Sequence, residues 1–86
     1  MKVENIKKDK TSWSVEVDGN KIVVENTPNE IRLFVNEKLQ DKYIGLIGSP
    51  KLIGLMSDGK LVNVSICGNF KMRCLIFVNG ELVLEA

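Results

Sequence analysis

The side chains that could perform chemistry in this chain are carboxylates and thiols, because its 86 residues contain no histidine. Without histidine, the commonest general base near neutral pH is missing, and so are Ser-His and Cys-His nucleophile pairs. Asp18 and Asp58 each precede a glycine, an order typical of tight turns. Glu81 and Glu85 share one strand parity and are expected to be solvated. The sequence therefore predicts a protein that is not an enzyme and has no catalytic residues.

The two cysteines, Cys67 and Cys74, flank a turn-like Gly-Asn pair. On a short hairpin they would be diagonal neighbours on one face, and a longer loop would place them opposite each other. A disulfide satisfies this geometry but is disfavoured in a reducing compartment, so we expect two free, largely buried thiols. Two cysteines without histidine do not complete a four-ligand zinc site, so we expect no metal. The glycines also lack the Gly-Lys-Ser/Thr sequence of a phosphate-binding loop, and we expect no cofactor.

The charge balance gives no sign of a polyanionic partner. Twelve Lys and Arg stand against eleven Asp and Glu, a net charge of +1, so neither nucleic acid nor an anionic membrane is expected as a ligand. Residues 69–73 (Asn-Phe-Lys-Met-Arg) alone mix aromatic and basic side chains. They leave one alternative open, a single-strand nucleic-acid binder of the oligonucleotide-binding type. No small-molecule ligand is evident.

The composition is that of one domain covering residues 1–86, with 44% hydrophobic and 27% charged residues. No run approaches the roughly 18 apolar residues of a membrane-spanning helix. The first residues, Met-Lys-Val-Glu-Asn-Ile-Lys-Lys, lack the apolar segment of a signal peptide. We therefore expect a cytoplasmic protein without a membrane partner.

The clearest structural signal is a hairpin over residues 72–84, where Asn79-Gly80 separates two apolar runs. Asn-Gly is typical of a type I′ turn, because both of its residues tolerate positive φ. The run before the turn is apolar on both parities, which indicates a central strand. One parity holds Cys74, Ile76 and Val78, and the other holds Leu75 and Phe77.

Period-2 alternation recurs along the chain, for example in residues 13–17, 31–35 and 62–66. Turn residues such as Asp18-Gly19 separate these runs, and no helical apolar stripe extends over three turns. The pattern predicts an all-β fold, an antiparallel β-sandwich of about eight short strands joined by tight hairpins. A barrel would satisfy the same alternation.

Two details of this sandwich are left open by the sequence. Residues 1–10 are polar apart from Val3 and Ile6, and form either a flexible lead-in or an edge strand. Residues 33–39 resemble residues 76–82 at an offset of 43 positions, as an internal duplication of a four-strand unit would produce. Similar turn residues in unrelated hairpins would produce the same likeness.

Four segments carry a family resemblance: residues 15–24, 33–36, 43–48 and 75–82. Their order resembles one domain of the Fas apoptosis inhibitory molecule family. The resemblance implies a compact antiparallel β-sandwich that acts as a non-enzymatic protein-interaction module. It transfers no functional residue, because the family has no catalytic motif. The tryptophan-bearing strand of the family is shortened here to residues 38–42.

The best candidate for a functional surface is a set of apolar residues on the second parity of three strands. These residues are Phe34, Leu75, Phe77 and Val23. A sandwich strand needs only one apolar parity for the core, so the other parity lies outside and marks a contact site. We expect an interaction or structural module, most simply a homodimer. The competing interpretation is that Val3 and Ile6 fold across this surface and cover it.

Overall fold

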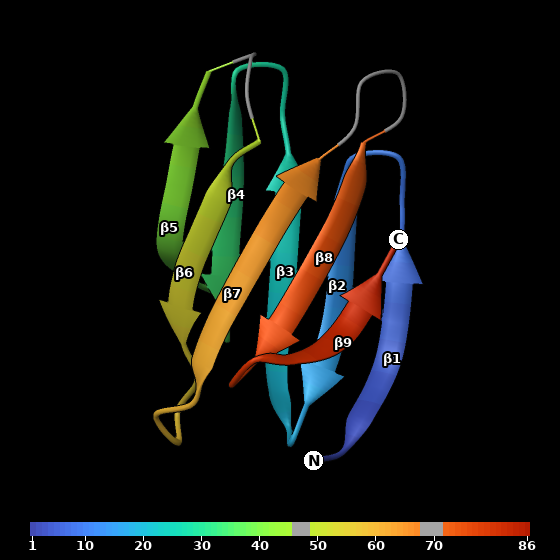
Figure 1. The fold of residues 1–86 in the computed structure, drawn as a ribbon, viewed down its shortest axis with the longest axis vertical. Coiled ribbons are helices and arrows are strands. Elements are labelled where there is room, and N and C mark those ends of the chain that lie inside the picture. Colours follow the sequence, from blue (N-terminus) through green and yellow to red (C-terminus); the bar gives the residue numbers. More distant parts are fainter. Residues whose placement is uncertain (46–48, 68–71) are drawn as a thin grey trace.

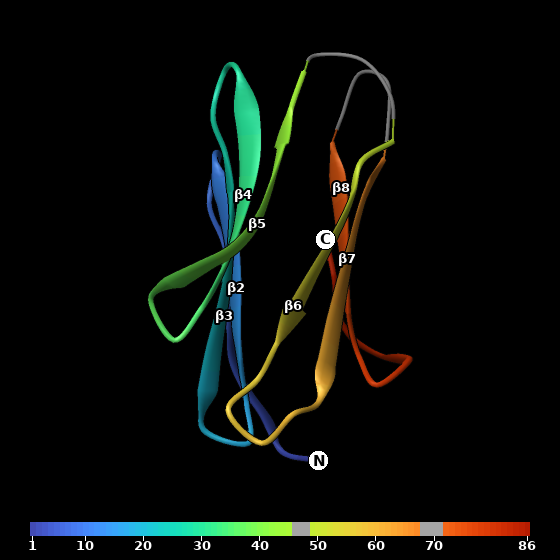
Figure 2. The ribbon, with the colours of Figure 1, turned by 90° about the vertical axis from the view of Figure 1, so that its left-hand side faces the viewer.

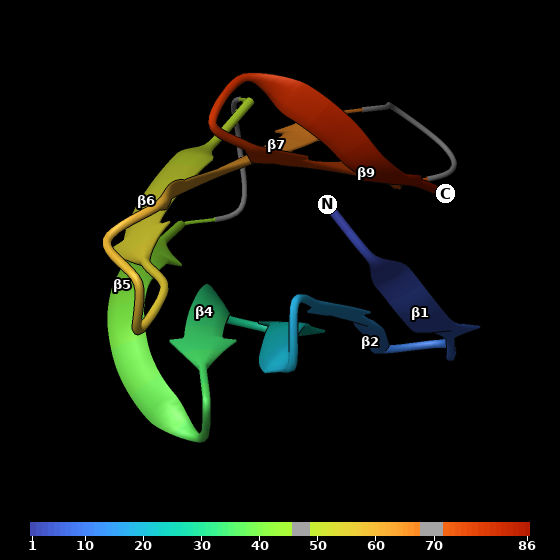
Figure 3. The ribbon, with the colours of Figure 1, turned by 90° about the horizontal axis from the view of Figure 1, so that it is seen from below.

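The protein folds as two facing β-sheets, as seen in a computed structural model that describes residues 1–45, 49–67 and 72–86 (Figure 1). The first sheet contains, in spatial order, β1 (Val3–Lys8), β2 (Ser12–Val17), β3 (Asn20–Asn26), β4 (Glu30–Val35) and β5 (Lys38–Ile44). The second contains β6 (Lys51–Leu55), β7 (Leu61–Cys67), β8 (Arg73–Val78) and β9 (Glu81–Glu85). The sheets lie as two layers (Figures 2 and 3). Both layers contribute residues to one hydrophobic core.

The predicted antiparallel sandwich is confirmed, with nine strands in the described residues instead of about eight. The prediction left residues 1–10 undecided, and they contain the edge strand β1. Residues 38–44 form the single strand β5, which ends immediately before Gly45. The described ranges contain no helix, and so none that is long and apolar enough to cross a membrane.

Burial follows the alternation that predicted the strands. Along β2, the side chains of Trp13, Val15 and Val17 are buried between the sheets, and the residues between them are half-buried on the outer face. The same pattern runs through β4 of the first sheet and through β7 and β8 of the second sheet, and these strands supply many of the other core residues. Because successive strand residues point to opposite faces, each strand contributes one parity to the core and leaves the other outside.

Turn chemistry agrees with the sequence at three hairpins. Asp18-Gly19 and Asn79-Gly80 both have positive φ at their two residues, as a type I′ turn requires (49° and 80°; 49° and 81°). Asn36-Glu37 adopts the same conformation with φ of 51° and 69°, although glutamate rarely occupies the left-handed region. These tight turns make each sheet a meander in which consecutive strands are neighbours.

The two sheets repeat one four-strand plan, with β2–β5 equivalent to β6–β9. In β4–β5 the register shifts between Leu33 and Phe34, and in β8–β9 it shifts between Ile76 and Phe77, the positions 43 residues later. The turn asparagines are also equivalent. Asn36 Oδ1 accepts a hydrogen bond from the Lys21 N–H, and Asn79 Oδ1 accepts one from the Leu61 N–H. The sequence likeness therefore corresponds to a structural repeat, to which β1 adds a fifth strand in the first sheet.

One lateral edge of the sandwich is closed by side chains of β5. The Ile53 N–H donates to Asp41 Oδ2 at 3.0 Å, and the Leu55 N–H donates to Gln40 Oε1 at 3.2 Å. Between them, Gly54 allows close packing, since a Cβ there would lie 2.9 Å from Gln40 Cβ. At the opposite edge, all six residues of β1 are exposed.

The different burial of two leucines on adjacent strands predicts different losses of stability when each is replaced by alanine. Leu33 is fully buried, whereas Leu39 is 51% exposed. We expect Leu33→Ala to lower the free energy of unfolding by about 2–5 kcal/mol, because it removes buried methyl groups and leaves a cavity. Leu39→Ala is the matched control and is expected to cost less than about 1 kcal/mol. Urea denaturation measures both, and equal costs would contradict the assignment of the inner face.

Candidate interaction surface

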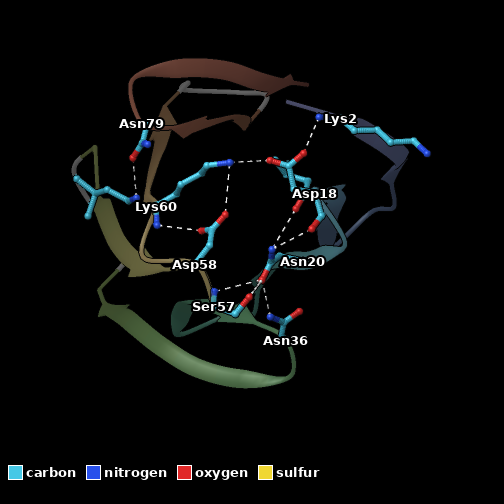
Figure 4. A network of polar contacts seen from close by, with 10 residues as sticks. Lys2, Asp18, Asn20, Asn36, Ser57, Asp58, Lys60 and Asn79 are labelled. Atoms are coloured by element: carbon cyan, nitrogen blue, oxygen red, sulfur yellow. Dashed lines mark hydrogen bonds and ion pairs between the residues drawn. The ribbon is translucent and has the colours of Figure 1, made fainter.

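A polar network joins the turns of both sheets at one end of the sandwich (Figure 4). Asp18 Oδ1 accepts a hydrogen bond from the Lys2 N–H at 2.7 Å, and Asp18 Oδ2 binds Lys60 Nζ at 2.7 Å. Lys60 Nζ also lies 3.4 Å from Asp58 Oδ2. Because Asp18 follows β2 and Lys60 precedes β7, this ion pair connects the two layers.

The charges of this network fix its protonation near neutral pH. The Lys2 N–H, and then the Lys60 ammonium, lower the pKa of Asp18 below its ordinary value of 3.8. Hydrogen bonds to Asp18 and Asp58 in turn raise the pKa of Lys60 above 10.5. Asp18 therefore stays ionised and Lys60 stays protonated at neutral pH, so Asp18 has no proton to give as a general acid and Lys60 does not serve as a base.

Asn20 is the buried centre of the network. Its Oδ1 accepts hydrogen bonds from Asn36 Nδ2 at 2.8 Å, Ser57 Oγ at 2.8 Å and the Ser57 N–H at 3.2 Å. Its Nδ2 donates to the backbone oxygens of Val17 and Asp18, both at 3.3 Å. One side chain thus ties three turns from two sheets, which is a structural task and needs no ligand to explain it.

The cysteines lie on opposite faces of the second sheet, which corrects the expected placement on one face. In the β7–β8 register, Cys67 is opposite Arg73 on the outer face and Ile66 is opposite Cys74 on the inner face. Both are free, with Cys74 buried and Cys67 half-buried. Burial raises the pKa of Cys74 to about 12, so this thiol is not a nucleophile at neutral pH. Within the described residues, no three His, Cys, Asp or Glu side chains gather as a possible metal site.

The four candidate contact residues lie on two opposite surfaces and not on one. Val23 and Phe34 are cross-strand neighbours on the outer face of the five-stranded sheet. Leu75 and Phe77 lie on the outer face of the four-stranded sheet, on β8. All four are half-buried. The four residues are divided between two surfaces because their strands belong to different sheets. The parity of a residue within its strand does not give that information.

The outer face of the five-stranded sheet carries a narrow apolar row among charges. Val23 pairs with Phe34, and Phe34 pairs with Leu39. Together with Lys21, Glu25 and Glu37, the first two residues line a shallow hollow. Charged groups therefore border the apolar row closely on this face.

The outer face of the four-stranded sheet is more extensively apolar, and we call it the apolar outer face. Its apolar residues are Ile53, Leu55, Leu61, Leu75, Phe77 and Leu82, and the polar residues Asn63 and Ser65 of β7 lie between those of β6 and those of β8 and β9. Ile53, Leu55 and Leu82 are 54%, 55% and 44% exposed. The residues that β6, β7 and β9 contribute were not predicted as contact residues from the sequence. A signal was present in β6, where Leu52 and Ile53 give both parities a large apolar residue.

The structural repeat allows the two outer faces to be compared position by position. The registers make Ser14 and Glu16 of β2 equivalent to Ile53 and Leu55 of β6. By the same registers, Lys21 is equivalent to Leu61, and Arg32 is equivalent to Leu75. Four polar positions of one face are thus apolar on the other, and one exchange runs the opposite way, since Val23 is equivalent to Asn63. Phe34 and Phe77, by contrast, are aromatic at the same position on both.

The N-terminal segment does not cover either candidate surface. Strand β1 pairs with β2 as a continuation of the five-stranded sheet. Val3 and Ile6 are themselves exposed. The apolar outer face is consequently accessible in the single chain.

The remaining aromatic residues do not form an exposed aromatic platform in the described part of the chain. Trp13 is buried in the core, and Tyr43 is half-buried against it. Residues 68–71, which include Phe70 of the basic aromatic stretch, lie outside the described residues, as do residues 46–48 of the family-like segment 43–48.

Comparison of the chain with protein-family models, characterised proteins and solved structures found no match. The resemblance to the Fas apoptosis inhibitory molecule family therefore stays a prediction.

The ion pair between the sheets predicts the titration of Asp18. We expect its pKa, measured by NMR on the carboxyl carbon, to lie below 3.8. Lys60→Met should raise it only partly, because the hydrogen bond from the Lys2 N–H remains. Lys42→Met, at an exposed position on β5, is the matched control and should leave it unchanged.

The same shift has a consequence for stability. A carboxyl with a lowered pKa stabilises the fold above its unfolded-state value, and this stabilisation is lost as pH falls through the lowered pKa. Acid unfolding of Asp18→Asn should accordingly depend less on pH below about 4 than that of the unmodified chain. An Asp18 pKa at or above 3.8 would contradict the described contacts.

Substitution of Asn20 is expected to lower the stability of the fold more than substitution of an exposed asparagine. Asn20→Ala leaves the donors of Ser57 and Asn36 without their buried acceptor, so we expect a loss of about 1–3 kcal/mol in unfolding free energy. Asn29→Ala, at an exposed turn position, is the control and should stay within about 0.5 kcal/mol. Urea denaturation followed by tryptophan fluorescence compares the two, and equal losses would remove the structural role of Asn20.

Proposed function

We propose that this protein is a small non-enzymatic interaction module that self-associates through the apolar outer face. The observation that carries the proposal is that six large apolar side chains occupy one outer sheet face. Large apolar side chains gathered on one face of a small domain usually mark a contact site. Three of these side chains are about half exposed in the single chain, so a partner that covers the face would bury them further.

The four-stranded sheet is favoured over the five-stranded one by its composition. Where the first outer face has Ser14, Glu16 and Lys21, the second has Ile53, Leu55 and Leu61. Burying a leucine or phenylalanine completely stabilises a complex by about 1.5–3 kcal/mol before the entropy of association is subtracted. Half-buried residues give less, but several on one face make a stable interface attainable.

Self-association is the simplest use of such a face. Most soluble oligomers are homo-oligomers, and a two-fold dimer needs only one self-complementary patch. A different protein with an apolar face would use the same residues. Either partner makes Leu75 and Phe77 contact residues, whereas Phe34 and Val23 on the other sheet are not needed.

The alternative function, binding of single-stranded nucleic acid, has less support. That function requires aromatic side chains grouped with basic ones along a groove. Phe34 and Phe77 lie on opposite faces of the sandwich, and Trp13 is buried. The near-neutral charge also gives little attraction for phosphates.

We also assign the protein to the cytoplasm. This assignment is supported by the half-buried, unpaired thiol of Cys67, because a reducing compartment keeps such thiols from forming disulfides with other molecules.

Two phenylalanines at equivalent positions provide the test. We expect the unmodified chain to sediment as a dimer at micromolar concentration, and Phe77→Lys to sediment as a monomer, because a charge would have to be buried in the interface. Phe34→Lys places the same change at the equivalent position of the other face and should leave the dimer intact.

Three results would contradict this proposal. A monomeric unmodified chain refutes self-association. A dimer broken by Phe34→Lys and not by Phe77→Lys moves the interface to the other sheet. A catalytic activity of the purified chain that disappears on substitution of one carboxylate would refute the non-enzymatic assignment.

A further inference from the structure

One cross-strand row of the apolar outer face ends in opposite charges. The registers align Lys51 of β6 with Ser65, Ser65 with Leu75, and Leu75 with Glu85 of β9. Lys51 and Glu85 thus occupy the two lateral edges of the sheet at the same height. Both are exposed. The neighbouring row instead ends in two apolar residues, Ile53 on β6 and Leu82 on β9.

Face-to-face packing of two such sheets restricts the possible dimers. Packed sheets keep their strand directions within about 30° of each other. A two-fold axis that lies between the sheets and runs along the strands places β6 over β9 of the partner subunit, and β7 over β8. Each cross-strand row then lies against the same row of the second copy, with its β6 end against the β9 end of the partner subunit. Lys51 therefore faces Glu85 of the partner subunit, and the symmetry makes this contact twice.

The ends of the neighbouring row are complementary under the same operation. Ile53 faces Leu82 of the partner subunit, so the exposed apolar ends of the row cover each other, while in the middle of the row Asn63 faces Phe77 of the partner subunit. The other possible two-fold axis runs across the strands, along the row from Lys51 to Glu85. It would place Lys51 against Lys51 of the partner subunit, and Glu85 against Glu85 of the partner subunit. Like charges placed directly opposite each other oppose association.

Glu85 is already oriented within its own chain. Arg73 Nη2 binds Glu85 Oε1 at 2.8 Å, which leaves Oε2 of the same carboxylate able to accept a second charged donor. The Lys51 ammonium of the other copy is a donor of that kind.

We propose that the partner of the apolar outer face is a second copy of this chain, held in the arrangement in which Lys51 pairs with Glu85 of the partner subunit. This inference rests on the proposed self-association and adds its geometry: the apolar residues supply the contact, and the two charges select the axis. Because the pairs lie at the rim, they affect which copies associate more than how tightly they do so.

A charge-reversal experiment tests this arrangement. Lys51→Glu brings two glutamates together at each rim of a homodimer, and Glu85→Lys brings two lysines together. Each single variant should dissociate at about tenfold or more higher concentration than the unmodified chain in low salt. Equimolar mixing should restore the dimer, because every rim contact in the mixed species is then Glu with Lys. The double variant Lys51→Glu/Glu85→Lys should also form a homodimer, which separates pairing from any effect of Glu85→Lys on folding.

Sedimentation at low and high salt, with circular dichroism as the check on folding, distinguishes the outcomes. Two single variants that dimerise like the unmodified chain, while Phe77→Lys does not, would overturn the arrangement and leave the interface standing. Weakened single variants that are not rescued by mixing would overturn the pairing. A monomeric unmodified chain would overturn both the arrangement and the proposed function.

Discussion

The structure depends on the burial of one face of each sheet against the other. Leu33 and Phe34 are adjacent in the chain, yet the first is fully buried and the second lies on the outer surface. A shift of one residue in the pairing of a strand that supplies the core would exchange such neighbours and expose its core residues. Burial therefore fixes the register of β2–β4 and β6–β9, whereas β1 and β5 have no fully buried side chain, and the register in turn determines which side chains remain outside for other uses.

Apolar contact is not directional, so it does not by itself orient one sheet on the other. Directional bonds do this at two places. At one end, Asn20 binds Asn36 in its own sheet and Ser57 from the connection between β6 and β7. At one side, Asp41 and Gln40 cap backbone N–H groups of β6. The contacts of Asn20 satisfy part-buried groups that would otherwise lose hydrogen bonds on leaving water, whereas those of Asp41 and Gln40 are exposed. Both sets link residues that are far apart in the sequence.

Local features of the fold were predictable because their causes are local. Asp18-Gly19 and Asn79-Gly80 carry their turn conformation in their own residue types, and the alternation of Val62, Val64 and Ile66 identifies a buried face. The edge strand β1 was harder, because its lysines and the positive φ of Asn5 break the alternation.

Non-local features were not predictable from residue parity. The opposite faces of Cys67 and Cys74 follow from the register across the β7–β8 connection, which the turn residues alone do not determine. Likewise, Phe34 and Phe77 were grouped on one surface because both are outward-facing, but they belong to different sheets. The contact residues of β6 and β9 join Phe77 only through pairing, so their relation is invisible in the linear sequence.

The repeat makes it possible to separate what the fold requires from what it permits. The two meanders share turn asparagines and register shifts, and most buried positions of β2–β4 recur in β6–β8, so equivalent outer positions meet the same backbone constraints. The first meander accommodates Glu16, Lys21 and Arg32 at positions where the second has Leu55, Leu61 and Leu75. The plan therefore tolerates charge at these positions, and the apolar residues of the second sheet are not needed to build it. Exposed, they would promote association. Their gathering on one face, with charges at the ends of one row, is the observation on which the proposed contact between chains rests.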